Sequence, residues 1–368
     1  MEARSKGGSV ADVIRKINLS AQNFTVHQEK TLRALSYCRT SALGGHIDAC
    51  DGCGNLSISY NSCRNRHCPQ CQGHKKEEWI QKREQELLPC SYYHVVFTLP
   101  EELNVLAISQ PELLYKTLFE AAWATLNQFG KNKGIQLGMI AILHTWGQNL
   151  SLHPHLHCIV PGGGINKQGK WRAKIKSDKY LFCVKAMSVV FRAKFVALLR
   201  ASGIKDQDLI DQLFTKKWVV YAKRPFGGPK QVIEYLGRYT HKVAISNHRI
   251  KEVTDNEVRF GYKDYRKEGQ KKEMTLSNIE FVRRFSLHIL PRRFVRIRHY
   301  GILSSSWKQG KLQDLQSELN VQIPQTKPKT LLKKCRCCKE GNLVTIALFG
   351  QRGPPQEFLF VTQTLSAK

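Results

Sequence analysis

Residues 153–157 read His-Pro-His-Leu-His, and this stretch decides the fold of the centre of the chain and the ligands that it offers. In a β-strand, side chains alternate between the two faces, so His155 and His157 project from one face, about 6.5 Å apart along the strand. Two imidazoles at that spacing can hold one divalent cation. Because such pairs often have only a structural role, metal binding by this pair has to be inferred from the surrounding sequence.

The flanking sequence predicts an antiparallel hairpin around the pair. Residues 139–146 and 155–160 read as strands separated by a short polar turn, and 94–99 read as a further buried strand that ends at a proline. The hairpin turn would bring Gln148 beside the histidines as a third ligand, with His144 and His153 as rival candidates. Imidazole and amide oxygen together suit Mg²⁺ or Mn²⁺, of which Mn²⁺ is better matched to nitrogen. Such an ion would act as a Lewis acid on a phosphate oxygen.

A helix further along the chain carries two tyrosines. It is expected to begin near Pro229, directly after two glycines. Tyr235 and Tyr239 are i,i+4 neighbours on one helical face, and Lys242 lies one turn beyond. A phenol is a nucleophile only as it loses its proton, and Lys242 and the metal-bound phosphate would supply positive charge for that step. Packing of both rings into the core is the competing interpretation.

The charge of the chain indicates a polyanionic partner. Its 368 residues hold 58 Lys and Arg against 29 Asp and Glu, a net charge of +29 with a pI near 9.8, and nucleic acid is the usual partner of such a protein. A basic run near the carboxy terminus is expected either to contact phosphates or to form a solvated face, and it comprises Arg292, Arg293, Arg296 and Arg298. No apolar run approaches the roughly 18 residues of a membrane span, and the first residues do not resemble a signal peptide, so a cytoplasmic protein is expected.

The cysteines indicate zinc. Six of the 12 fall between Cys38 and Cys71, and two CxxC pairs are separated by fourteen residues, close to the usual span of a structural zinc site. The predicted ligands of this site are Cys50, Cys53, Cys68 and Cys71. A possible second site would use Cys38, His46, Cys63 and His67. Cys335 and Cys338 form only half a site, because no cysteine or histidine follows them, and they are the weakest of these candidates.

Together these patterns predict an α+β fold, an antiparallel sheet with helices on its faces. The predicted boundaries are a helical segment over 1–35, a zinc-binding domain with a connector helix over 36–90, a catalytic domain over 91–303, and a basic tail or small appended module over 304–368.

Several blocks of the chain resemble the two-tyrosine HUH transposases of rolling-circle insertion sequences, relatives of Helitrons. The blocks are CDGCG from Cys50, NSCRNRHCPQCQ from Asn61, HVVFTLP from His94, residues 144–164, residues 227–250 and LPRRFVRIRHYGIL from Leu290. The resemblance implies an HUH fold with a five-stranded antiparallel sheet behind an amino-terminal zinc-binding domain. It also puts the metal histidines at His155 and His157 and the nucleophiles at Tyr235 and Tyr239.

The resemblance further implies cleavage and transfer of single-stranded DNA at element ends and target, through 5′-phosphotyrosine intermediates. No GxxxxGK[ST] loop occurs, so strand opening would depend on host replication or helicase machinery. Two other functions stay open at this point. One is a plasmid rolling-circle replication initiator with the same nicking chemistry, and the other is a zinc-dependent DNA-binding protein without catalysis.

Overall fold

A computed structural model describes residues 8–71, 79–173, 181–222, 231, 232, 237, 243–322 and 333–358. Tyr235, Tyr239 and Lys242 lie outside these described residues. Of the connector helix predicted before the first strand of the catalytic domain, residues 79–84 are helical. Within the described ranges, no helix combines the length and apolar composition that crossing a bilayer requires.

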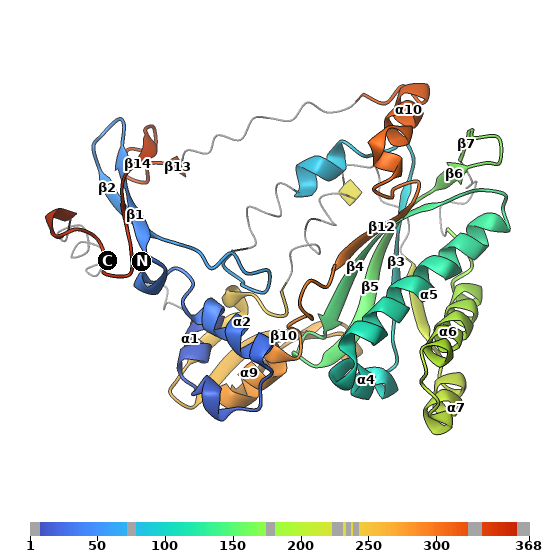
Figure 1. The fold of residues 1–368 in the computed structure, drawn as a ribbon, viewed down its shortest axis with the longest axis horizontal. Helices are drawn as coiled ribbons and strands as arrows, with labels where there is room; N and C mark the ends of the chain where they lie inside the picture. The colour runs from blue at the N-terminus through green and yellow to red at the C-terminus, as the bar shows by residue number, and fades with distance from the viewer. Residues whose placement is uncertain are drawn as a thin grey trace.

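A five-stranded antiparallel sheet forms the centre of the molecule, with strand order β12-β4-β5-β3-β8 (Figure 1). Its strands are β3 (Tyr92–Thr98), β4 (Gly138–Trp146), β5 (Leu152–Pro161), β8 (Val219–Ala222) and β12 (Ile297–Gly301). The predicted hairpin is confirmed as β4 and β5, in which His144 lies directly opposite His155. The predicted α+β class is confirmed as well.

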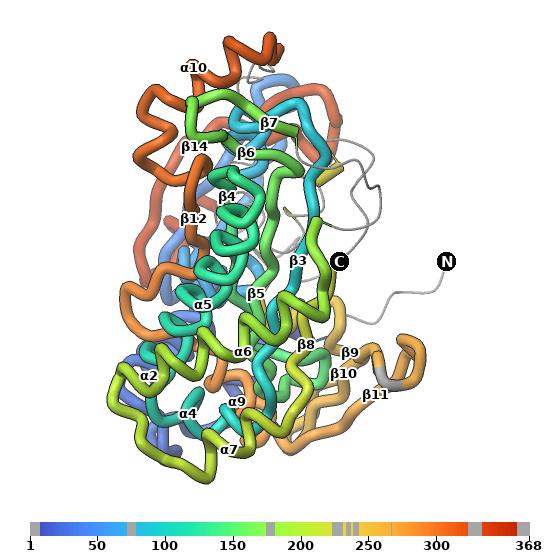
Figure 2. The backbone as a smooth tube through the Cα atoms, turned by 90° about the vertical axis from the view of Figure 1, so that its right-hand side faces the viewer, coloured from blue at the N-terminus to red at the C-terminus, as the bar shows by residue number. Residues whose placement is uncertain are grey.

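Helices cover one face of this sheet, with α5 and α6 lying across it in Figure 2. The helices on this side are α4 (Asn104–Ser109), α5 (Pro111–Lys131), α6 (Val184–Ala201) and α7 (Gln207–Thr215). Phe97, Leu143 and Leu156 point toward them and are fully buried in the largest apolar core. Because strand side chains alternate, His155 and His157, on either side of Leu156, project from the opposite face.

A smaller unit lies on the histidine side of the sheet. Its three antiparallel strands are β9 (Ile250–Val253), β10 (Glu257–Asp264) and β11 (Gln270–Ser277), and the helices are α1 (Val10–Arg15), α2 (Val26–Ser36) and α9 (Asn278–Ser286). Val13, Leu32, Phe260 and Phe281 share one apolar core. The predicted amino-terminal helical segment therefore packs against residues from the second half of the chain.

A four-stranded sheet combines two strands from the amino-terminal part of the chain with two from the carboxy-terminal part, and it lies apart from the five-stranded sheet in Figure 1. It has the order β13-β14-β1-β2. Its strands are β1 (Gly45–Cys50), β2 (Leu56–Tyr60), β13 (Lys333–Lys334) and β14 (Asn342–Phe349). Elsewhere the described residues form a small hairpin of β6 (Gly163–Ile165) and β7 (Trp171–Ala173) and the helix α10 (Lys311–Glu318). Residues 304–368, expected to be a tail or small module, thus supply α10 and a strand that pairs with β1.

Candidate active site and thiol clusters

Three histidines converge on the open face of the five-stranded sheet. The ligand nitrogens of His144, His155 and His157 all lie within 4.8 Å of one another. The strand register explains this cluster, since His144 is paired with His155, and His157 follows two residues later on the same face. The register thus favours His144, a rival candidate in the sequence, as the third partner of His155 and His157. β4 ends at Trp146, so Gln148 belongs to the turn, where its backbone carbonyl accepts a hydrogen bond from Arg249.

Outer contacts orient two of the three rings. His155 Nδ1 lies 2.6 Å from the carbonyl oxygen of His153, so this nitrogen carries the proton and donates it, which leaves Nε2 with its lone pair available. His157 Nδ1 lies 2.8 Å from Nε2 of the buried His94. Burial lowers the pKa of His155 to about 4, so its imidazole is neutral at physiological pH, the form that binds metals.

The sequence did not single out His94 as a site residue. It shares a face with Val96 and Thr98 on β3, and the register of β3 against β5 brings that face beside His157. The signal available in the sequence was a histidine at the start of the strand predicted over residues 94–99. Without the register of the neighbouring strand, it could not be distinguished from an ordinary buried histidine.

The histidines line a cavity of about 720 Å³ between the sheet and the smaller unit. One wall comes from the sheet and includes Trp146, Thr98 and Tyr221. Another comes from the smaller unit and includes Arg249, just before β9, and Tyr265, just after β10. Gln148 and His153, the other predicted ligand candidates, line the same cavity. The space is large enough for a nucleotide-sized ligand to enter above the imidazoles.

The chain on either side of the predicted nucleophiles lies on this face of the sheet. Val232 is fully buried and packs with Tyr92, Ile142 and Ile159, and Ile142 is the register partner of His157. Val243 lines the cavity. Residues 233–242, which include Tyr235, Tyr239 and Lys242, are therefore flanked by two residues that contact the histidine face.

The predicted DNA-binding arginines occupy different environments. Arg292 and Arg293 are exposed. Arg298 instead places its guanidinium 4.3 Å from the ring centre of Phe119, on the helix-covered side of the sheet. Burial, with a smaller effect of the nearby Arg66, lowers the pKa of Arg296 to about 10. The four arginines therefore do not share one environment, because Arg292 and Arg293 are exposed whereas Arg298 packs on Phe119.

The first thiol cluster differs from the predicted grouping. Cys68 and Cys71 lie with Cys38 and Cys63, and the sulfur atoms of Cys38 and Cys63 lie 3.5 and 3.6 Å from that of Cys71. Four thiolates around zinc at 2.3 Å would be separated by about 3.8 Å, so this set fits a structural zinc site. The possible histidine ligands are not part of it. His46 Nε2 lies 3.5 Å from an oxygen of Asp48, and His67 Nε2 accepts a hydrogen bond from Arg66.

The predicted pairing of the two CxxC motifs is wrong for a geometric reason. Cys50 and Cys53 lie at the turn between β1 and β2, whereas Cys38 precedes β1 and Cys63 follows β2. Strands of this length put about 17 Å between the two ends of the hairpin. Cys50 and Cys53 instead lie with Cys335 and Cys338, which were the weakest candidates for zinc ligands in the sequence.

The first thiol cluster lies beside the histidine cavity. Pro69, between two of its cysteines, lines the cavity, and Cys38 and Cys68 belong to the apolar core of the smaller unit. The Arg66 guanidinium donates hydrogen bonds to the carbonyl oxygens of Phe294 at 2.6 Å and of Pro291 at 2.8 Å. The cluster thus holds a wall of the cavity against the segment that leads into β12.

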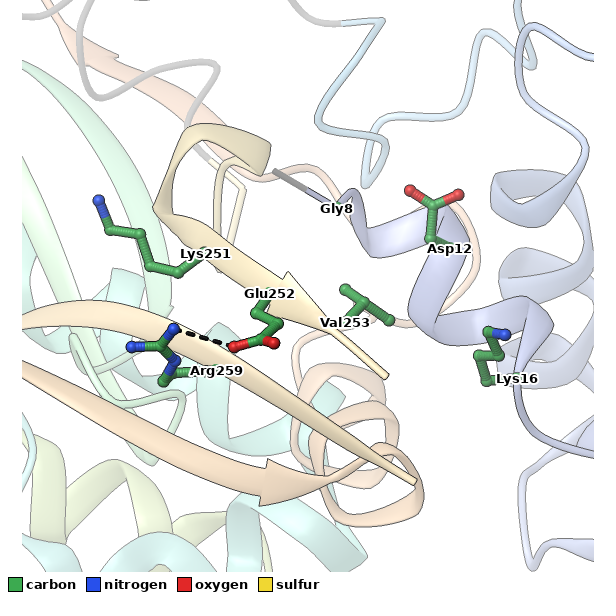
Figure 3. Close-up of a pocket in the computed structure, with 7 residues that line it drawn as sticks. All are labelled: Gly8, Asp12, Lys16, Lys251, Glu252, Val253 and Arg259. Atoms are coloured by element: carbon green, nitrogen blue, oxygen red, sulfur yellow. Dashed lines mark hydrogen bonds and ion pairs between the residues drawn. The ribbon is translucent and has the colours of Figure 1, made fainter. Parts of the chain in front are cut away.

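Figure 3 shows a separate hollow of about 620 Å³ between α1 and the strands β9 and β10. Its charged side chains are largely matched with one another or with neighbours. Arg259 forms an ion pair with Glu252, and Lys16 one with Asp255. It holds none of the predicted site residues, so the candidate active site is the histidine cavity.

Comparisons with known proteins identify the family of the chain. Residues 138–310 match a family model described as "Putative transposase", and residues 10–99 match one described as "Transposase zinc-binding domain". A "Putative transposase y4qJ" of Sinorhizobium fredii is 41% identical over 394 residues, covering 96% of this chain and 98% of that protein. The "Transposase for insertion sequence element IS801" of Pseudomonas savastanoi pv. phaseolicola is 28% identical over 316 residues, covering 82% and 76%.

The two family models and the two relatives thus define the chain as a transposase. The chain belongs to the IS91-type family of transposases, which confirms the resemblance seen in the sequence. A solved structure, described as TrwC complexed with a 27-mer DNA comprising the recognition hairpin and the cleavage site, is 12% identical. It covers 63% of this chain and 75% of that chain, at a TM-score of 0.25, which is too low to support a comparison of folds.

Proposed function

We propose that this transposase cuts and rejoins single-stranded DNA at the ends of a rolling-circle insertion sequence through 5′-phosphotyrosine linkages. The observation that carries the proposal is the position of the imidazole cluster. His144, His155 and His157 form the floor of a cavity, and the tyrosine-bearing segment is flanked by Val232 and Val243 on the same side of the sheet.

The three imidazoles are the proposed ligands of a catalytic Mn²⁺ or Mg²⁺. Three imidazole nitrogen donors favour Mn²⁺ of these two ions, because Mg²⁺ prefers oxygen. The chemistry that a bound divalent ion supplies here is polarisation of the scissile phosphate. His94 is a positioning residue, because its contact with His157 Nδ1 directs the other ring nitrogen of His157 toward the cavity.

Tyr235 and Tyr239 are the proposed nucleophiles. In cleavage, the phenol oxygen of one tyrosine bonds to phosphorus, the bond from phosphorus to the 3′-oxygen breaks, and the phenol proton ends on the released 3′-hydroxyl. Rejoining is the reverse reaction with a different 3′-hydroxyl. The phosphodiester bond energy is retained in the phosphotyrosine, so no nucleotide cofactor is required. A second tyrosine allows a second strand end to be cut before the first is released. Lys242 would stabilise negative charge on the phenol oxygen.

The substrate follows from the charge and the cavity. A net charge of +29 favours nucleic acid, and counterion release makes such binding weaken steeply as salt rises. A cavity that admits one nucleotide above the imidazoles suits an unpaired strand better than a duplex. The chain has no phosphate-binding GxxxxGK[ST] loop, so host replication or helicase machinery would provide the single strand.

The test is formation of a covalent complex. Protein incubated with Mn²⁺ and single-stranded DNA from the element's own ends should form an adduct that survives denaturing electrophoresis. Each single change, Tyr235→Phe or Tyr239→Phe, should leave part of the adduct but impair complete transposition, and the double change should leave none.

Two other tyrosines of the same cavity provide matched controls. Tyr221 and Tyr265 also line it, so Tyr221→Phe and Tyr265→Phe should form adduct normally. Adduct that persists in the double variant, or that disappears in either control, would place the nucleophile elsewhere. A wild-type protein that binds DNA but never forms an adduct would support the non-catalytic alternative.

A further inference from the structure

Cys335 and Cys338 lie beside two cysteines from the other end of the described chain. The sulfur atoms of Cys50 and Cys338 lie 3.7 Å apart, those of Cys53 and Cys335 lie 3.8 Å apart, and all four lie within 4.8 Å of one another. These separations match the roughly 3.8 Å edge of a tetrahedron of thiolates bound to zinc at 2.3 Å. They are well beyond the ~2.05 Å of a disulfide.

The surrounding backbone is arranged as it is at tight zinc-binding turns. The amides of Gly52 and Cys53 each donate to Cys50 Sγ at 3.4 Å, and the amide of Gly341 donates to Cys338 Sγ at 3.3 Å. Such donors stabilise thiolate ligands. Gly341 is also the residue that fits at this point, since a Cβ there would lie 2.4 Å from Cys50 Sγ.

Strand pairing brings the two halves together. β14 pairs antiparallel with β1, and Cys50, the last residue of β1, is opposite Leu343. The Asp51 carboxylate accepts a hydrogen bond of 2.7 Å from the backbone amide of Asn342. The buried Asp48 accepts another of 2.7 Å from the Thr345 hydroxyl. The position of the carboxy-terminal pair is thus fixed by contacts other than those between the thiols.

We propose that Cys50, Cys53, Cys335 and Cys338 form a second structural zinc site that fastens β14 to the amino-terminal zinc-binding domain. The residues that match the family's zinc-binding domain, 10–99, supply only two of its four ligands. The carboxy-terminal strand is therefore an integral part of that domain, and the zinc would close a loop that contains the entire catalytic domain. The inference does not depend on the tyrosine chemistry.

The first experiment counts zinc in full-length protein purified under reducing conditions. Wild type should hold two zinc ions per chain, Cys338→Ser one, and Cys63→Ser one. Cys337→Ser is the matched control, because Cys337 lies between the two ligands but is exposed and outside the cluster, and it should retain two. Gly341→Ala keeps every thiol but should lower the count to one. A wild type with one zinc, or a Cys338→Ser variant with two, would overturn the proposal.

A second measurement requires no ligand variant. Cys53 and Cys337 are both exposed, so alkylation of the folded wild-type protein compares a proposed ligand with a neighbouring free thiol. With zinc bound, Cys337 should be modified rapidly and Cys53 slowly, and after chelation both should be modified at similar rates. Equal modification before chelation would overturn the proposal, as would recovery of Cys53 in a disulfide with Cys335 from freshly reduced protein.

A third test addresses the fastening. A specific protease site is inserted between Gln322 and Lys333. After cleavage, the otherwise wild-type protein should elute as one species in size-exclusion chromatography when the buffer contains zinc. The same protein should release its carboxy-terminal fragment after chelation, and the Cys338→Ser version should release it even in zinc. A fragment that stays bound in both cases would mean that strand pairing suffices and that zinc does not fasten the strand.

Discussion

His94 Nε2 lies 2.8 Å from His157 Nδ1, and the planes of the two imidazole rings are within 9° of parallel. The contact links β3 to β5 within the site. β3 carries no proposed metal ligand, so it contributes to the site by holding His157 through His94. Of the two ring nitrogens of His157, this contact occupies Nδ1, so Nε2 is the one directed to the metal. The orientation of a metal ligand is thus set by a residue on the neighbouring strand.

Removing that support should weaken metal binding without removing a ligand. We expect His94→Ala to raise the Mn²⁺ concentration required for half-maximal cleavage by about 10- to 100-fold, the usual effect of losing an outer partner. The matched control is Thr98→Ala, on the same strand and the same cavity wall, which should change it little. An unchanged Mn²⁺ requirement in His94→Ala would show that the contact has no role in positioning the ligand.

The third metal ligand can be identified by comparing three single variants. His144→Ala should lose Mn²⁺ binding and cleavage, because its ring nitrogen is part of the cluster with His155 and His157. Gln148→Ala and His153→Ala should retain both, since Gln148 lies in the turn after β4 and the ring of His153 is not part of the cluster. Mn²⁺ affinity measured by calorimetry distinguishes the three. Loss of affinity in Gln148→Ala with none in His144→Ala would restore the assignment based on the sequence.

Arg66 provides a way to separate the first zinc cluster from its support of the cavity. Arg66→Ala removes the donors to the carbonyl oxygens of Pro291 and Phe294, and leaving such half-buried groups unpaired costs about 1–3 kcal/mol of unfolding free energy. The zinc count should be unchanged, whereas stability in denaturant and the cleavage rate should both fall. Arg64→Ala is the control. Full activity in Arg66→Ala would mean that this contact does not position Pro69 at the cavity.

Stability should decrease in acid because of His288. Burial lowers the pKa of His288 from 6.5 to about 4, and its ring nitrogens contact the Leu150 carbonyl at 3.1 Å and the Thr145 hydroxyl at 3.2 Å. Between these pH values the unfolded chain binds a proton that the folded chain does not, so unfolding free energy falls as pH drops from 6.5 to 4, by about 3 kcal/mol.

The His288→Gln variant isolates this contribution. Urea unfolding between pH 4 and 6.5 should show a dependence on pH that is shallower by about 1.4 kcal/mol per pH unit than in wild type. Both proteins should be compared at one salt concentration. Identical slopes in the two proteins would show that His288 titrates normally in the fold.

The arginines of the basic run should differ in their contribution to DNA binding, according to whether they are exposed or packed. Arg292→Ala and Arg293→Ala each remove an exposed charge. If that charge contacts one phosphate, the slope of log K for single-strand binding against log salt concentration should become shallower by about 0.7. Arg298→Ala should leave that slope unchanged and lower thermal stability instead, because its guanidinium packs over Phe119. A reduced slope in Arg298→Ala alone would contradict this division.

Much of the local structure follows from the sequence. The predicted hairpin around the histidines is present, and α5 begins at Pro111, a residue type favoured in the first turn of a helix. These elements rest on hydrophobic periodicity and on helix-start signals, both of which act within a few residues. β11 and β14 were missed, since β11 is rich in charge and β14 exposes three of its apolar side chains.

The sequence by itself determined which residue types are present to do chemistry: a His-x-His pair on a strand, two tyrosines at helical spacing, and thiols in CxxC turns. Tertiary structure decided how they are grouped. Strand register placed His144 opposite His155, and the length of the β1–β2 hairpin separated Cys50 from Cys68. The pairing of β14 with β1 brought Cys335 and Cys338 to a half-site far away in the sequence. Spacing along the chain fixes only which side chains share a turn or a strand face, whereas ligand sets are completed by contacts between segments distant in sequence, and these depend on register and packing.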